Sequence, residues 1–138
     1  ADVLGGTHDI PTRVRDLTDG AMVPVVYDSI GRVTFEDSLN CLAPRGLMVS
    51  YGNASGAVTD VAVGTLASHG SLYLTRPSLG TYIAQRDELV EGATELFGLV
   101  EQGILTPRIG QSFALKDAAQ AHVALESRKT TGSTILLP

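Results

Sequence analysis

The chain has 138 residues, of which 43% are hydrophobic and 18% charged, a balance typical of a globular protein with one ordinary domain's worth of core. The net charge is −5 and the ten Lys and Arg residues are scattered along the chain, which argues against a nucleic-acid partner. The longest apolar runs, such as Val23–Tyr27 and Ile135–Leu137, are far shorter than the roughly 20 residues that a membrane helix needs, and no signal-peptide pattern opens the chain. We therefore expect a soluble cytoplasmic protein, and the single cysteine, Cys41, which can form no internal disulfide, fits a reducing compartment.

The first half of the chain alternates between helical and strand patterns. Ile10, Val14 and Leu17 recur at helical spacing, which predicts a helix over residues 9–19. The pattern then predicts a buried strand over 23–27, a helix from Phe35 to Leu42 ended by "APRG", a buried strand over 47–51, a short helix over 60–68 and a strand over 71–75. Because two apolar strands joined by a helix must run parallel, the fold class is α/β with a parallel sheet.

The second half begins with a long amphipathic helix. The segment "RDELVEGATELFGLVEQG" places Leu89, Ala93, Leu96, Phe97 and Val100 on one stripe, and Gly103 closes the helix. A short strand is expected near Phe113, and "GSTILLP" forms a final strand. Between them a helix over 115–128 has an expected inner face made of Leu115, Ala118, Ala119, His122 and Leu125.

Few residues suggest chemistry on their own. His8, His69 and His122 are widely separated and have no Cys or acidic partner at metal-ligand spacing, so we predict no metal site. Ser29 follows a strand but lacks the G-x-S-x-G pattern of a hydrolase nucleophile. The sequon at Asn53–Ser55 is idle in a cytoplasmic protein.

Two expected strands finish on small polar residues. The segments "VVYDSIG" and "MVSYGNASG" end where parallel strands present their carboxyl ends, which is where open α/β sheets bind ligands. The alternative is that Gly and Asn merely form the turns, as they often do. A nucleotide-binding fold should also carry a G-x-G-x-x-G turn, and these 138 residues contain none.

Long blocks of the chain resemble a known family. The blocks "VVYDSIGRVTFEDSLNCLAPRGLMVSYGNASG", "GSLYLTRPSL", "DELVEGATELFGLVEQG" and "LKDAAQAHVALESRKTTGSTILLP" resemble the C-terminal part of NADPH-dependent quinone oxidoreductases, the zeta-crystallin-like branch of the medium-chain dehydrogenase/reductase superfamily. The resemblance implies a C-terminal fragment, with the glycine-rich turn lying upstream. It also implies that residues 1–103 are the second half of a Rossmann cofactor-binding domain, and that 104–138 is a helix and strand belonging to the GroES-like catalytic domain.

The resemblance also implies a set of cofactor-binding residues. Those that match positions lining the NADPH cleft are Ser29, Tyr51, Gly52, Asn53 and Ala54. Leu72, Tyr73 and Leu74 match residues near the nicotinamide, and Arg128 matches an arginine that reaches the cofactor. Relatives commonly read "VINY" where this chain has "VLGGTHD", so Gly5 and Gly6 cannot supply the tyrosine contact on the adenosine side.

Two functional classes follow from the resemblance. In the first, the chain is part of a zinc-independent oxidoreductase that transfers hydride from NADPH to a quinone and is inactive alone. In the second, it is a non-catalytic module that retains only self-association. In either class the strand at Ser71–Thr75 is expected at the sheet edge, where the family forms a homodimer.

Overall fold

The computed structural model describes residues 9–138, which divide into two compact units, 9–82 and 83–138. We describe each unit by itself. Gly5 and Gly6, where relatives read "VINY", lie outside the described residues, and so does His8. The described chain places the long helix in the second unit, whereas the sequence predicts a family domain boundary at Gly103, and that family boundary remains a prediction.

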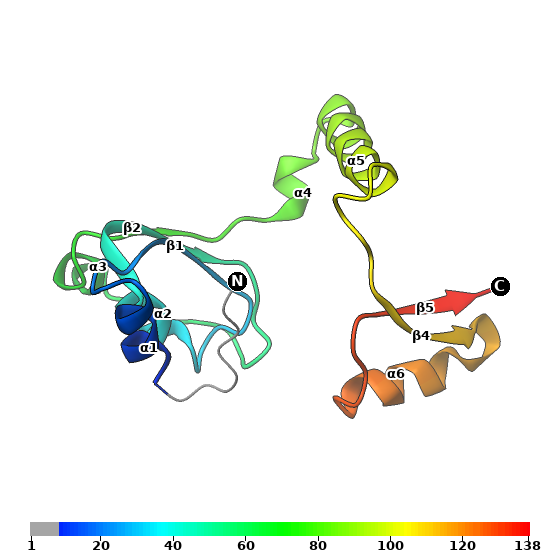
Figure 1. Ribbon diagram of the computed structural model, residues 1–138, viewed down its shortest axis with the longest axis horizontal. Helices are drawn as coiled ribbons and strands as arrows, with labels where there is room; N and C mark the ends of the chain where they lie inside the picture. The colour runs from blue at the N-terminus through cyan, green and yellow to red at the C-terminus, as the bar shows by residue number, and fades with distance from the viewer. Residues whose placement is uncertain (1–8) are drawn as a thin grey trace. The chain divides into compact units, whose positions relative to one another are not determined.

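The described part of the first unit contains a three-stranded parallel sheet and short helices (Figure 1). Its strands are β1 (Val23–Asp28), β2 (Leu42–Ser50) and β3 (Tyr73–Thr75), in the order β1-β2-β3. The helices are α1 (Ile10–Leu17), α2 (Phe35–Asn40), α3 (Val63–Ser68) and α4 (Leu79–Tyr82), and α2 packs against both β1 and β2. The predicted α/β class and the parallel pairing are confirmed.

The core of the first unit lies between β2 and α2. Leu39, Leu42, Met48 and Leu72 are buried together, and Val23, Val26, Phe35 and Leu66 pack against them. Burying side chains of this size is the main favourable contribution to folding. The carboxyl ends of the strands, where the candidate site lies, are therefore supported by a packed apolar core.

Several predictions about the first unit need correction. The second helix ends at Asn40 rather than Leu42, and β2 starts at Leu42, because the "APRG" segment bulges within the strand and Arg45 takes a left-handed φ of 64°. The third strand is Tyr73–Thr75 rather than Ser71–Thr75, and the short helix begins at Val63. The expected buried strand, β1, leaves Tyr27 72% exposed, because one face of β1 packs on α2 while Tyr27 points away from it.

The second unit contains the long helix and a parallel strand pair (Figure 1). Helix α5 (Arg86–Glu101) is followed by β4 (Ile109–Ala114), the 3-10 turn η1 (Leu115–Asp117), α6 (Ala118–Glu126) and β5 (Ser133–Leu137). Gly103 takes a φ of 71° and its N–H donates to the Val100 carbonyl at 3.0 Å, so the predicted helix stop is confirmed.

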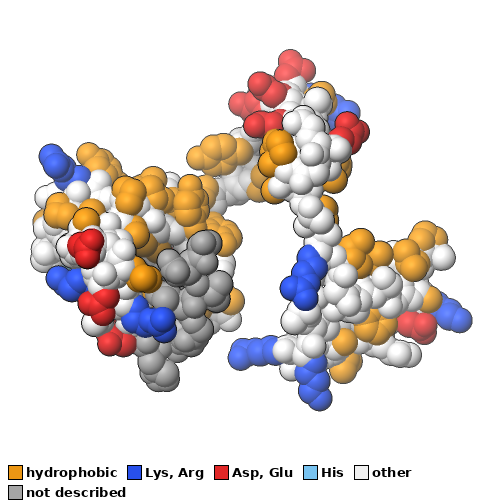
Figure 2. Space-filling view, in the orientation of Figure 1, with side chains coloured by type: hydrophobic (Ala, Val, Ile, Leu, Met, Phe, Trp, Pro, Cys, Tyr) orange, Lys and Arg blue, Asp and Glu red, His pale blue; other side chains and the backbone are white. Residues whose placement is uncertain are grey.

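The apolar stripe of α5 is present but uncovered within the described second unit. No side chain of α5 is buried, and Phe97 is 65% exposed. Acidic side chains gather on this helix, and apolar side chains reach the surface of both units (Figure 2). The expected inner face of α6 is also wrong in detail: Ala121 is buried, whereas Leu115 and Leu125 are each more than half exposed, because only the two short strands cover the helix.

Candidate functional site

The candidate site lies at the carboxyl end of the first unit's sheet. Asp28, the last residue of β1, pairs with Ser50, the last residue of β2, so both strands end at the same edge. The loops 29–34 and 51–62 leave the sheet side by side. Parallel strands that end together place their following loops in one cluster, as the sequence predicts.

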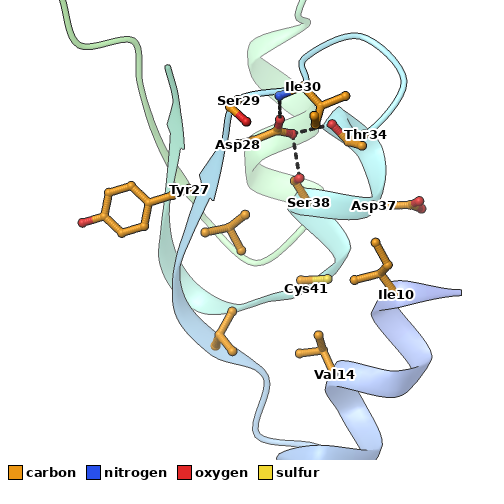
Figure 3. Close-up of a pocket in the computed structure, with 12 residues that line it drawn as sticks. Ile10, Val14, Tyr27, Asp28, Ser29, Ile30, Thr34, Asp37, Ser38 and Cys41 are labelled. Atoms are coloured by element: carbon orange, nitrogen blue, oxygen red, sulfur yellow. Dashed lines mark hydrogen bonds between the residues drawn. The ribbon is translucent and has the colours of Figure 1, made fainter. Parts of the chain in front are cut away.

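The Asp28 carboxylate organises the first loop. Oδ1 accepts hydrogen bonds from the N–H groups of Ile30 at 2.7 Å and Gly31 at 2.9 Å. Oδ2 accepts from the hydroxyls of Thr34 at 2.7 Å and Ser38 at 2.8 Å (Figure 3). Burial raises the pKa of this carboxyl, but the hydrogen bonds from Gly31, Thr34, Ser38 and Ile30 outweigh burial and hold the pKa below its ordinary value. Asp28 is therefore ionised at neutral pH and fixes the turn that carries Ser29.

The second loop is hydrogen-bonded to the first through the backbone. The Asp28 carbonyl accepts from the N–H groups of Tyr51 at 2.9 Å and Gly52 at 3.3 Å, and the Ser29 carbonyl accepts from Ala54 N–H at 3.3 Å. The Ile30 carbonyl accepts from both the N–H and the hydroxyl of Ser55, each at 2.8 Å. The two loops are thus one connected structure.

The glycines of these loops permit the loops to approach one another. A Cβ on Gly52 would lie 2.1 Å from the Ser29 carbonyl oxygen. A Cβ on Gly31, whose φ is 91°, would lie 2.7 Å from the Gly56 carbonyl oxygen. The simpler of the two interpretations, that small residues form the turns, therefore accounts for these glycines, because the backbone brought close to them is that of the neighbouring loop.

The structure brings together five of the nine predicted cofactor-binding residues: Ser29, Tyr51, Gly52, Asn53 and Ala54. The Tyr51 side chain is 51% exposed, and Asn53 and Ala54 are also exposed at this edge. Hydroxyl, phenol and carboxamide groups, together with exposed backbone, suit the ribose and amide groups of a dinucleotide. The described residues therefore fit part of such a cofactor.

Of the other predicted residues, Leu74 lines a pocket at the ends of β2 and β3 together with Asn53, whereas Leu72, Tyr73 and Arg128 lie elsewhere. Tyr73 pairs with Leu47 and Leu74 with Met48, so both lie below the carboxyl edge of the sheet. Leu72 belongs to the buried core with an exposed fraction of 6%, so its side chain is not available to a ligand. Arg128 belongs to the second unit, where it follows α6 with a φ of 58° and an exposed side chain.

Two pockets flank the sheet of the first unit. One, of about 280 Å³, lies between β1, α1 and α2, and its lining includes Ile10, Val14, Asp37 and Cys41 (Figure 3). Burial and the negative charge of Asp37 raise the pKa of the Cys41 thiol. The other, of about 240 Å³, lies at the ends of β2 and β3, where the Arg76 guanidinium donates to the Ser50 carbonyl at 2.8 Å.

Sequence reasoning missed Asp28 and Arg76. A signal for Asp28 was available, because an Asp at a strand end followed by small residues commonly accepts hydrogen bonds from the next backbone N–H groups. Thr34 and Ser38 lie at the right positions to donate once α2 forms, but that requires the helix to fold back onto β1. No local pattern pointed to Arg76, since its partner is 26 residues away.

The architecture defines an α/β protein whose candidate ligand edge lies at the carboxyl ends of parallel strands. A family model described as "Zinc-binding dehydrogenase" matches residues 4–136, so the chain belongs to that family. The quinone oxidoreductase of Pseudomonas aeruginosa is 56% identical over 95% of this chain. The crystal structure of Escherichia coli quinone oxidoreductase complexed with NADPH matches 95% of the chain with a TM-score of 0.89 and 53% identity. The predicted resemblance to quinone oxidoreductases is confirmed.

Two further facts limit how much of the relatives' function can be assigned to this chain. The chain spans 40% of the Pseudomonas aeruginosa protein and 41% of the Escherichia coli chain. A 2-haloacrylate reductase from a Burkholderia species is 44% identical over 96% of this chain, which covers 40% of that protein. Relatives at this level of identity therefore act on chemically different substrates.

The family description includes zinc, and the described residues do not fit that metal. Between residues 9 and 138 no group of three or more His, Cys, Asp or Glu side chains lies close enough together to hold a metal ion. His69 instead contacts Glu36, with 3.0 Å between Nε2 and Oε1, and the Thr65 carbonyl, with 2.8 Å from Nδ1. That the protein is independent of zinc stays a prediction.

Proposed function

We propose that this chain supplies part of the cofactor-binding domain of a cytoplasmic oxidoreductase that transfers hydride from NADPH to a quinone. The observation that carries the proposal is the joined pair of strand-end loops, in a chain 53% identical to a protein crystallised with NADPH. When bound, the nicotinamide would supply the hydride, and the protein would contribute position and a dry pocket. Among residues 9–138, no helix is both long and apolar enough to cross a membrane.

The proposed roles follow the geometry of the site. Ser29, Tyr51 and Asn53 bind the cofactor through side-chain polar groups, while Gly52 and Ala54 contribute backbone at the same edge. We assign Tyr73 and Leu74, which lie below the carboxyl edge of the sheet and are 63% and 36% exposed, to the nicotinamide side of the cofactor. Because the Leu72 side chain is in the core, any contact that Leu72 makes with the cofactor is through its backbone.

A chimera tests the proposal. The upstream part of the Pseudomonas aeruginosa relative, joined to this chain at the start of their match, is expected to reduce a quinone with NADPH at a rate close to that of the parent relative. Because the upstream part is common to both proteins, any difference comes from this chain. Adding 2-haloacrylate as a competing substrate asks whether this chain alters the choice of substrate. A folded chimera that neither binds NADPH nor reduces a quinone would contradict the proposal.

The isolated chain provides the second arm of this test. No G-x-G-x-x-G turn is present in its 138 residues, and such a turn at a helix N-terminus holds much of the pyrophosphate of a dinucleotide. We therefore expect weak NADPH binding and no quinone turnover from the isolated chain. Rapid quinone reduction by the purified chain would overturn this expectation.

The second candidate function is a non-catalytic module that self-associates. It is favoured by the position of β3, which is the last strand of the sheet in the described chain. A strand at a sheet edge has backbone groups available for pairing with another copy. We propose a homodimer through this edge, and it is compatible with either candidate function.

A further inference from the structure

The buried Asp28 carboxylate has four hydrogen-bond donors, all within its own strand-loop-helix segment. Asp28 is 5% exposed, and two of the donors are backbone N–H groups while two are hydroxyls. Burying a charged carboxylate costs free energy unless its oxygens accept hydrogen bonds. The four donors around Asp28 must therefore stay in place for the charge to remain buried. The segment from Asp28 to Ser38 is therefore held in one conformation by this one side chain.

The same segment determines where the second loop lies. The carbonyls of three consecutive residues, Asp28, Ser29 and Ile30, accept hydrogen bonds from Tyr51, Gly52, Ala54 and Ser55. In the opposite direction, the Ser55 hydroxyl accepts from Val33 N–H at 3.1 Å, and the Gly56 carbonyl accepts from Arg32 N–H at 3.1 Å. If the turn after β1 changes conformation, these partners of the second loop lose their places as well.

We propose that Asp28 is a positioning residue for the cofactor: by fixing the turn after β1 it sets the positions of both Ser29 and the Tyr51–Ala54 segment. This inference rests on the proposed function and assigns Asp28 no contact with the cofactor. It acts through the residues proposed to bind. The outward-facing groups of the two loops are then preorganised, which lowers the entropic cost of binding.

The chemistry of the four donors predicts a graded series of variants. In Asp28→Asn the amide oxygen can accept from the Ile30 and Gly31 N–H groups, and the amide nitrogen can donate to the Thr34 and Ser38 hydroxyls, which can rotate to accept. In Asp28→Ala all four donors lose the carboxylate, although the Thr34 hydroxyl keeps the Gly31 carbonyl as an acceptor at 3.2 Å. Asn should therefore preserve most of the positioning, whereas Ala should remove it.

The experiment uses the chimera described above and two measurements. Hydrogen exchange of the cofactor-free protein, read by mass spectrometry, reports the order of residues 51–56, and titration with NADPH gives the dissociation constant. For Asp28→Ala we expect faster exchange in this segment and a dissociation constant raised about tenfold or more, which corresponds to about 1.4 kcal/mol. For Asp28→Asn we expect exchange and affinity close to those of the parent chimera.

Two further variants complete the design. Asp37→Asn is the matched control, because this carboxylate lies on α2 beside the same pocket but does not hold the turn, and it should change neither measurement. Thr34→Val removes a single donor from Oδ2 with little change in volume, and it replaces Asp28→Ala if that variant does not fold. We then expect faster exchange of residues 51–56 and a smaller rise in the dissociation constant.

The outcomes separate this proposal from the proposed function. A parent chimera that does not bind NADPH refutes the proposed function, and the positioning role with it, before any variant is compared. If the parent chimera binds NADPH but Asp28→Ala, or Thr34→Val in its place, leaves either exchange or affinity unchanged, only the positioning role is refuted. Faster exchange together with weaker binding, rescued by Asn, supports it.

Discussion

At the scale of single residues, the balance of burial and hydrogen bonding decides what each polar group does. Asp28 and Cys41 are both buried in the first unit, at 5% and 4% exposed. The carboxylate has four donors, so its charged form is favoured despite burial, whereas the thiol has burial and a neighbouring negative charge, which both disfavour the thiolate. Similar burial therefore leaves the carboxyl ionised and the thiol neutral, because their neighbouring groups differ.

The lowered pKa of Asp28 predicts how its contribution to stability depends on pH. A carboxyl whose folded-state pKa lies below the unfolded value of about 3.9 stabilises the fold fully above that pH, and the contribution is lost as the pH falls through the folded-state pKa. We expect Asp28→Asn to lower the free energy of unfolding by about 1–2 kcal/mol at pH 7, because hydrogen bonds to a charged acceptor are replaced by neutral ones. Urea unfolding from pH 7 to pH 3 should show this difference shrinking only below about pH 4. A difference that is constant over the range would contradict the assignment.

The raised pKa of Cys41 predicts slow reaction with thiol reagents. The reactive species is the thiolate, and both burial and Asp37 disfavour it. We expect the native chain to react with a chromogenic disulfide much more slowly at pH 8 than the same chain in urea. Asp37→Asn removes the repelling charge and should increase the native rate modestly. Equal rates in the native and unfolded states would show that Cys41 is accessible.

Arg128 either binds the cofactor, as the resemblance implies, or is an exposed cation after α6 that binds nothing. Arg128 lies just past α6 with a left-handed φ of 58°, its side chain is exposed, and its backbone N–H donates to the Leu125 carbonyl at 3.1 Å. If it binds the cofactor, Arg128→Ala in the chimera should weaken NADPH binding by roughly 1.5–3 kcal/mol, the value of a charge-assisted hydrogen bond, without unfolding the protein. Lys129→Ala is the matched control, since it removes the neighbouring exposed cation. An unchanged NADPH dissociation constant for Arg128→Ala removes it from the proposed site.

At the scale of elements, the glycines divide into those that allow close backbone approach and those that do not. Gly52 lies against the Ser29 backbone, whereas a Cβ on Gly64, within α3, would contact nothing within 4 Å. The side-chain space around a glycine, rather than its presence in a loop or helix, therefore decides what a substitution does.

This difference gives a matched pair of alanine variants. Gly52→Ala should destabilise the first unit by at least about 1–3 kcal/mol, because the two strand-end loops must separate to admit the methyl group. Gly64→Ala should instead stabilise the chain by roughly 0.5–1 kcal/mol, because alanine loses less backbone entropy in a helix. Chemical denaturation measures both. A Gly52→Ala variant as stable as the parent would mean that the loops do not pack as described.

At the scale of the whole molecule, each unit has an apolar surface that its own described residues leave uncovered. The α5 stripe, with Phe97 65% exposed, and the outer face of β1, with Tyr27 72% exposed, both have apolar area that their own unit does not cover. The relatives are about two and a half times longer than the matched region, as the 40% coverage indicates. Exposed apolar area of this extent is typical of surfaces that contact other protein.

The edge position of β3 predicts self-association. We expect the chimera to sediment as a dimer at micromolar concentration. Tyr73→Lys should shift it toward monomer, because two-fold symmetry brings like charges together at the paired edges. Tyr82→Lys, an equally exposed tyrosine outside β3, is the control. A strictly monomeric parent would contradict the proposed dimer.

The sequence by itself determined the α/β class, the parallel strands and the location of the candidate site. Periodicity identifies β2 and α5 because strand and helix spacing are local properties, and small polar residues after two buried strands indicated the carboxyl edge of the sheet. The tertiary structure alone decided what those small residues do. Gly52 and Gly31 are close to the neighbouring loop, and Asp28 holds that arrangement through partners as far as ten residues away. It also decided that Leu72 is a core residue and that β1 is half exposed, because burial depends on which other elements cover a strand, and the local sequence does not specify its neighbours in space.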